Sequence, residues 1–71
     1  MVVLKINPGK ASGGGVLKDN QERWIKGFSI HIGIASNYIT EIWVVRYGLK
    51  MAWELRYKHI NLEIESQFLF N

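Results

Sequence analysis

Residues 36–49 constrain the fold most, because they have the pattern of a helix start and lie between runs with strand character. Ser36 or Asn37 can cap this helix by offering a side-chain oxygen to the free N–H groups of its first turn. Apolar residues then recur at steps of three and four, at Tyr38, Ile42, Val45, Leu49 and Ala52. The spacing predicts one core-facing stripe on a helix that runs to about Tyr57.

Gly48 lies inside the predicted helix, where glycine costs ~1 kcal/mol relative to alanine. Two helical turns separate Gly48 from Glu41, so both residues belong to one face of the helix. A glycine is favourable there if that face packs tightly against a sheet.

Four runs have strand character: residues 2–6, 14–19, 24–30 and 60–65. The first run ends at Asn7-Pro8-Gly9, a turn signal, and the polar residues 19–23 predict a hairpin between the second and third runs. The expected order is β-β-β-α-β, an α/β fold with an antiparallel meander, a crossover helix and a last strand parallel to an earlier one. One helix leaves the other face of such a sheet uncovered.

The composition predicts a single small domain over residues 1–71. At this size the free energy gained by burying apolar surface is close to the conformational entropy lost on folding, so the core alone gives marginal stability. There are no cysteines, and 48% of the residues are apolar, too many for a disordered tail. The net charge of +3 permits contact with nucleic acid without indicating it. No apolar run approaches the ~20 residues that span a bilayer, so we expect an intracellular soluble protein without membrane contact.

Two acidic positions are candidates for a functional site. Glu41 lies in the first turns of the predicted helix, and Glu63-Ile64-Glu65-Ser66 closes the last strand-like run. Carboxylates on a helix and at a strand end suit a divalent-metal site, since oxygen is the ligand type that Mg²⁺ prefers. The set is incomplete for such a site.

Short motifs occur in a recognisable order: Leu4-Lys5-Ile6-Asn7, the glycine-rich segment 8–19, Trp24, Gly27-Phe28-Ser29, Ser36-Asn37, Glu41 with Trp43, Arg46, Gly48 and Leu49, and Glu63-Ile64-Glu65-Ser66. No single piece is specific, but the ordered set covers nearly the whole chain. In this order the chain resembles the ribonuclease H-like domain of the plant, reverse-transcriptase-associated type.

The resemblance implies a mixed five-stranded sheet with helices that hydrolyses the RNA strand of RNA–DNA hybrids with two Mg²⁺ ions held by acids. It assigns the catalytic and metal-binding roles to Glu41, the helix acid, and to Glu65, where the family has Asp followed by Ser. The first-strand acid is missing, because Asn7 runs straight into Pro8-Gly9 and Gly9 stands at the Asp position in an ungapped alignment. The final acid, the later helices and the last strand would follow Asn71. Glu22 replaces a usual turn glycine, and Thr40 a usual alanine.

The resemblance also suggests a nucleic-acid contact at Asn37, which would meet the minor groove of the hybrid. Independently of the resemblance, Lys10 is a candidate for contact with a phosphate. Simpler roles are a helix cap for Asn37 and a solvated surface lysine for Lys10. Glu41 can likewise be a solvated helix carboxylate, and Glu65 a surface acid at a strand end. Trp43 lies on the helix face opposite Glu41, where packing is a simpler role than base stacking.

We therefore predict a truncated ribonuclease H-like domain that binds nucleic acid and has lost most or all hydrolysis, with Mg²⁺ as the family's cofactor. The alternatives are a non-catalytic module that docks its uncovered apolar sheet onto a protein partner, or a gene fragment without a selected function.

Overall fold

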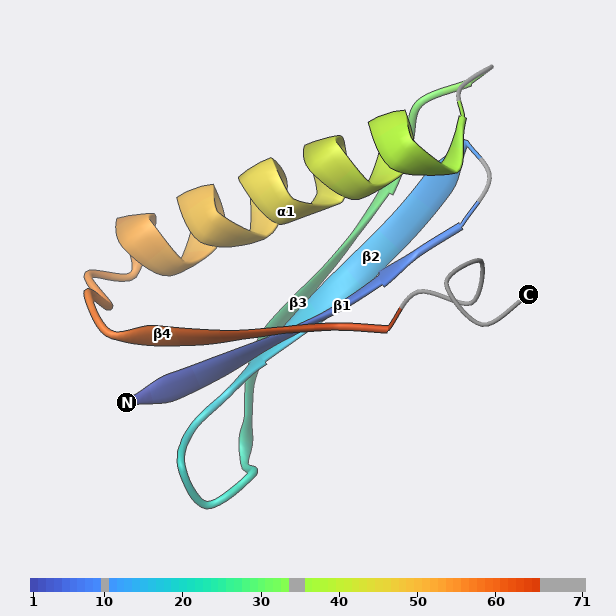
Figure 1. The fold of residues 1–71 in the computed structure, drawn as a ribbon. Coiled ribbons are helices and arrows are strands. Elements are labelled where there is room, and N and C mark those ends of the chain that lie inside the picture. The colour runs from blue at the N-terminus through green and yellow to red at the C-terminus, as the bar shows by residue number, and fades with distance from the viewer. Residues whose placement is uncertain (10, 34–35, 66–71) are drawn as a thin grey trace.

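The computed structural model describes residues 1–9, 11–33 and 36–65. Its elements are β1 (Val2–Pro8), β2 (Ser12–Lys18), β3 (Trp24–His31), α1 (Asn37–Glu54) and β4 (Ile60–Ile64). They form one sheet of order β3-β2-β1-β4 with α1 across one face (Figure 1). β2 pairs antiparallel with both β1 and β3, and β4 pairs parallel with β1. The predicted β-β-β-α-β order, mixed sheet and parallel last strand are confirmed.

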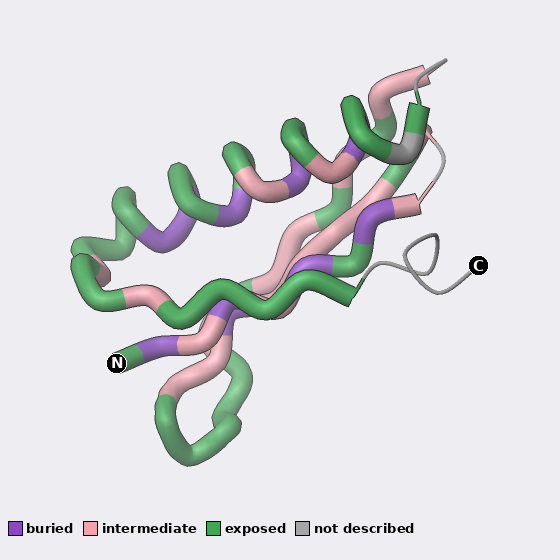
Figure 2. Tube along the Cα trace, in the orientation of Figure 1, coloured by how far each residue is buried: buried purple, intermediate pink, exposed green. Residues whose placement is uncertain are grey.

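The core lies between α1 and the two strands beneath it, β1 and β2. β1 alternates, so that Val2, Leu4 and Ile6 are buried towards the helix, and Leu17 of β2 is buried beside Leu4. Figure 2 shows the buried residues of α1 on the side that faces the sheet. Period-two burial on the strand and one buried side of the helix are the patterns expected for a helix packed on a sheet.

The helix buries a different stripe from the predicted one. The buried residues are Thr40, Val44, Gly48, Met51 and Ala52. Of the predicted stripe only Ala52 is buried and Val45 is half-buried; Tyr38 is 66% exposed and Ile42 58% exposed. The stripe prediction was therefore wrong, because it ranked positions by hydrophobicity whereas the contact is set by size.

Gly48 shows why small residues face the sheet. A β-carbon added there would lie 2.7 Å from Cδ2 of Leu4, closer than side chains approach one another. At Gly13 of β2 an added β-carbon would lie 2.7 Å from Cγ2 of Val44. The helix approaches both strands at positions without a side chain, so the tight packing predicted for Gly48 is confirmed.

The helix ends at Glu54, three residues before the predicted Tyr57. Arg56 adopts φ 69°, and its N–H donates to the Trp53 carbonyl at 2.8 Å, while the Tyr57 N–H donates to the Ala52 carbonyl at 3.1 Å. This pair of bonds is a Schellman motif, usually built on glycine. Because an arginine takes the left-handed position, the sequence carries no glycine to mark the stop.

Asp19 organises the turn between β2 and β3. Its Oδ1 accepts hydrogen bonds from the backbone N–H groups of Arg23 at 2.8 Å and Gln21 at 2.9 Å. Its Oδ2 accepts one from Nε of Arg23 at 2.8 Å. The Arg23 backbone N–H is the largest of the causes that hold the pKa of Asp19 below its ordinary value of 3.8. Glu22 takes φ 63° in this turn, the backbone region that favours the glycine it replaces.

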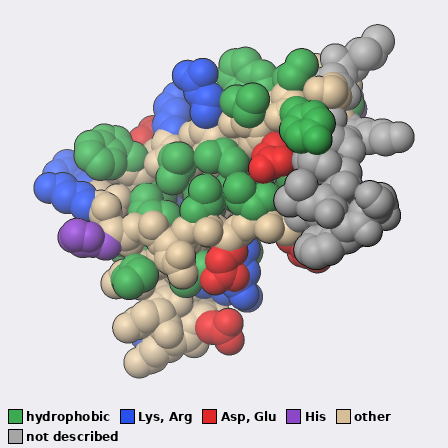
Figure 3. All heavy atoms as spheres, in the orientation of Figure 1, with side chains coloured by type: hydrophobic (Ala, Val, Ile, Leu, Met, Phe, Trp, Pro, Cys, Tyr) green, Lys and Arg blue, Asp and Glu red, His purple; other side chains and the backbone are tan. Residues whose placement is uncertain are grey.

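The sheet face away from α1 carries mostly polar side chains. The register places Asn7, Ser29 and Glu63 there, together with Lys5 and Val16. Exposed apolar side chains lie on the helix side instead: Leu62 is 38% exposed and Ile64 39% exposed. Figure 3 shows hydrophobic side chains gathered between α1 and β4. Within the described ranges, no helix is both long and apolar enough to cross a membrane.

Candidate functional site

The start of α1 is fixed to the turn between β1 and β2. Ser36 is the cap, and its Oγ accepts a hydrogen bond from the Ile39 N–H at 3.2 Å. Oγ1 of Thr40 donates to the Ser36 carbonyl at 3.0 Å and accepts from the Ala11 N–H at 3.2 Å. Thr40 is fully buried, so its hydroxyl is the link between the helix start and the strand turn.

We expect Thr40→Val to lower the free energy of unfolding by about 1–3 kcal/mol. Valine keeps the shape but leaves the half-buried Ala11 N–H without its partner, and an unsatisfied donor that is shielded from water costs up to this much. Chemical denaturation of the parent and the variant would measure the loss. Thr40→Ser is the control, since it keeps the hydroxyl; if serine proved as damaging as valine, the hydrogen bond would not be the cause.

Glu41 follows Thr40 in the first turns of α1 and is half-buried. It makes no hydrogen bond or ion pair to another described residue. The neighbouring residue Thr40 is hydrogen-bonded to Ala11, so the backbone of Glu41 is held close to the turn between β1 and β2.

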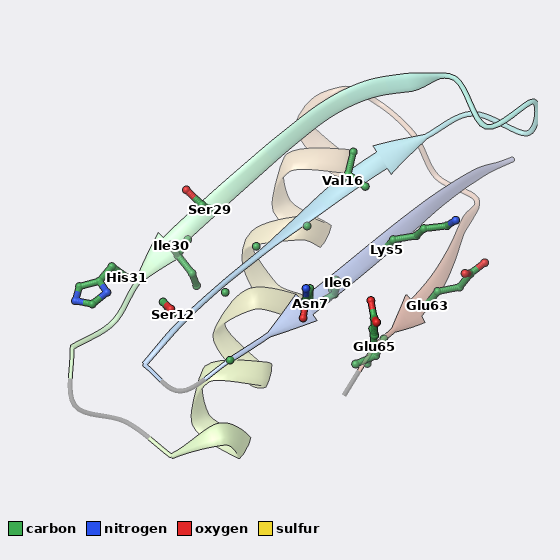
Figure 4. Close-up of a pocket in the computed structure, with 15 residues that line it drawn as sticks. Lys5, Ile6, Asn7, Ser12, Val16, Ser29, Ile30, His31, Glu63 and Glu65 are labelled. Carbon is green, nitrogen blue, oxygen red and sulfur yellow. The ribbon is translucent and has the colours of Figure 1, made fainter. Parts of the chain in front are cut away.

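Glu65 directly follows β4, and its N–H donates to the Ile6 carbonyl at 2.8 Å. This bond extends the parallel pairing and holds Glu65 beside the end of β1. The Glu65 side chain lines a shallow groove on the sheet face away from the helix, together with Asn7, Glu63 and Lys5 (Figure 4).

The two predicted metal ligands lie at one end of the sheet and are carried on different sides of it. The start of α1 contacts the turn between β1 and β2, and Glu65 lies beside the end of β1. None of the α1 side chains that the structure describes lines the groove that contains Glu65. To bind the same ion, the side chains of Glu41 and Glu65 would have to meet beyond the end of the sheet. Their joint role in metal binding stays a prediction.

Lys5 places a positive charge in the groove that Glu63 and Glu65 also line. It lies in register with Glu63 on β4, and its Nζ is 3.6 Å from Oε1 of Glu22. Both side chains of that ion pair are substantially exposed, so the pair contributes at most about 1 kcal/mol. A cation flanked by two acids neutralises part of the negative charge that a metal ion would need.

The described residues do not supply a two-magnesium site. They contain no group of three or more His, Cys, Asp and Glu side chains arranged to hold a metal. Two hard cations need several oxygen ligands and bridging carboxylates. Asn7, at the end of the first strand, offers only a neutral amide to the groove. We therefore derive no chemical step through a metal.

The remaining predicted contacts lie partly outside the described structure. Lys10 is not among the described residues, and of Asn37 only the backbone is, as the first residue of α1. The role of Thr40 in fixing the helix start was not predicted from the sequence. A hydroxyl four residues after the cap serine was the available signal.

Comparison with known proteins agrees with this fold. Residues 2–71 match the family model described as "Reverse transcriptase-like". The chain is 46% identical over 63 residues to a protein of Arabidopsis thaliana named "Putative ribonuclease H protein". That match covers 89% of this chain and 10% of the relative, so the chain corresponds to about a tenth of the relative's length. No solved structure matches. The chain belongs to the reverse transcriptase-like family of ribonuclease H-like domains.

Proposed function

We propose that the chain is a nucleic-acid-binding module of ribonuclease H type that engages RNA–DNA hybrids and hydrolyses them poorly or not at all. The observation that carries this proposal is the family match over residues 2–71 combined with Asn7-Pro8-Gly9, where the first catalytic acid is absent. The family relationship supports binding, and the sequence at the end of β1 argues against hydrolysis.

The arrangement of β1, β4 and the start of α1 around the candidate site supports a retained role in nucleic-acid binding. β4 is parallel to β1, and the start of α1 is joined to the turn between β1 and β2 by Thr40. In this proposal Asn37, at the start of α1, contacts the hybrid minor groove, and Lys10, in that turn, contacts a phosphate. Backbone charge would supply most of the affinity, as in other nucleic-acid complexes.

We expect hybrid binding that weakens steeply with salt, and Lys10→Gln should weaken it further. Loss of one phosphate contact should lower the slope of log affinity against log salt by about one. Fluorescence anisotropy with a labelled RNA–DNA hybrid of about 16 base pairs, at several salt concentrations, measures both effects. Lys58→Gln is the matched control, because Lys58 follows the opposite end of α1.

Two results would contradict this proposal. One is binding that does not change between low and physiological salt. The other is an equal loss in the Lys10 and Lys58 variants, which would show a non-specific charge effect.

A protein-interaction module is the second candidate, and one observation favours it. Leu62 and Ile64 of β4 are more than a third exposed beside α1, as apolar residues of docking surfaces are. This candidate differs from the sequence-based alternative, which placed an apolar surface on the uncovered sheet face. Failure of the parent to bind any nucleic acid at low salt would favour it.

A further inference from the structure

Four residues on the outer side of α1 form a second surface of interest. Trp43, Arg46, Tyr47 and Lys50 follow one another at steps of three, one and three, and together they line a shallow hollow. The ring centroids of Trp43 and Tyr47 are 6.5 Å apart, with the planes tilted by 48°. Cζ of Arg46 lies 5.5 Å from the Trp43 ring centroid. We call these four residues the aromatic-basic flank.

Both aromatic rings of the flank remain open to solvent. Trp43 is 43% exposed and Tyr47 49% exposed, although Val44 between them is fully buried. Trp43 is thus only partly packed, and its ring interacts with Tyr47 and Arg46 of the same helix. Large aromatic surfaces that face water are a typical feature of binding sites.

The charges of the flank are not balanced by acids. No acidic residue of the described chain lines the hollow, and neither Arg46 nor Lys50 forms an ion pair there. A second hollow near the end of α1 is lined by Trp53, Glu54, Arg56 and Lys58 and does contain an acid. The two hollows therefore share aromatic and basic residues but differ in net charge, and the flank is the more positive.

We propose that the aromatic-basic flank binds single-stranded nucleic acid. Bases stack on Trp43 and Tyr47, and Arg46 and Lys50 contact the phosphates between them. Single-strand binding sites combine these two features, aromatic platforms for bases and cations along the backbone. A duplex hides its base faces in its own stack, and an acidic peptide has charge but few π faces, so a single strand uses both features of the flank.

The ring geometry is compatible with this ligand. Stacked bases are about 3.4 Å apart, so rings 6.5 Å apart and tilted suit separate bases rather than one continuous stack. Arg46 already lies over Trp43, but exposed cation–π contacts are weak and an incoming base can replace the guanidinium. The inference goes beyond the proposed hybrid site, since it uses neither Asn37 nor Lys10.

The first experiment measures binding of a fluorescein-labelled twelve-nucleotide oligouridylate by anisotropy at low salt. Trp43→Ala should weaken binding about tenfold, within the range seen when a stacking aromatic is removed. Trp43→Phe should keep most of the affinity, because phenylalanine still offers a π face. Trp53→Ala is the matched control: it removes a tryptophan of the same helix that is 67% exposed and should leave affinity unchanged.

The second experiment tests the charges. The double variant Arg46→Gln, Lys50→Gln should lower the slope of log affinity against log salt by about 1.4, since each single-strand phosphate contact contributes about 0.7. Arg56→Gln, Lys58→Gln removes the same charge at the helix end and should leave the slope unchanged. Circular dichroism checks that each variant is folded.

Three results would overturn the inference: a parent that does not bind the oligouridylate, a Trp53→Ala variant that loses as much affinity as Trp43→Ala, or Trp43→Phe and Trp43→Ala variants that both bind like the parent. Binding of the RNA–DNA hybrid separates this proposal from the proposed function. Trp43→Ala should leave the affinity for the hybrid unchanged, and Lys10→Gln should leave the affinity for the oligouridylate unchanged.

Discussion

Leu4→Ala is expected to lower the free energy of unfolding by about 2–5 kcal/mol, the usual cost of truncating a fully buried leucine. Leu4 of β1 is completely buried beneath α1, where its Cδ atoms occupy the space in front of Gly48. A domain of 71 residues has a total stability of roughly 4–10 kcal/mol, so this one change removes a large share of it. Urea denaturation followed by circular dichroism gives the loss.

Substitution of Gly48 gives a second test of the same packing, because its effect on stability should depend on the residue at position 4. In the parent, Gly48→Ala gains up to ~1 kcal/mol of helix propensity but forces the Leu4 side chain to move, and overpacking costs about 1–3 kcal/mol. In the Leu4→Ala background the new methyl group enters the cavity, so Gly48→Ala should stabilise. A double-mutant cycle measures this coupling.

Leu62→Ala is the control for the cycle, since Leu62 is 38% exposed and its truncation leaves a smaller cavity. It should cost clearly less than Leu4→Ala. Additive effects of Leu4→Ala and Gly48→Ala would contradict the packing described for this helix.

The strands were more predictable from sequence than the buried face of the helix. A β-branched, apolar run that stops at a turn signal identified β1, and alternation of apolar and polar residues identified β4, which pairs with β1 in a sheet that has one covered face. On α1, large apolar residues cover most of the circumference, so hydrophobicity alone does not identify the buried side. The choice is made by Thr40, Val44 and Gly48, which let α1 approach the sheet closely. Their fit to β1 and β2 is tertiary information that a one-dimensional pattern lacks.

The candidate site was predictable in its residues and less so in its arrangement. The resemblance selected Glu41 and Glu65, and the strand order places both at one end of the sheet. Which side of the sheet carries each acid follows from the strand register and from the position of the helix. The aromatic-basic flank was not predicted, because two aromatic and two basic residues at helical spacing are also common on packed helices.

The chain is expected to show no detectable cleavage of an RNA–DNA hybrid with Mg²⁺, and little with Mn²⁺. The family reaction uses two metal ions to stabilise the attacking and the leaving oxygen, and each ion needs several oxygen ligands. Asn7-Pro8-Gly9 supplies no carboxylate at the end of β1, and Lys5 lies in register with Glu63 beside Glu65. Glu41 and Glu65 together could hold one ion weakly. Glu65 also carries one methylene more than Asp, and a shift of about 1 Å at a reacting centre can cost on the order of 100-fold.

A cleavage assay on purified protein, with a labelled hybrid and an active ribonuclease H as the positive control, tests this expectation. Glu41→Gln is assayed beside the parent, because it removes the helix carboxylate while keeping the side-chain shape. Trace cleavage that is equal in both proteins comes from a contaminating nuclease and agrees with the prediction. Robust cleavage by the parent that disappears in Glu41→Gln would show that Glu41 works without a first-strand acid, and that another group at the end of β1 supplies the absent charge.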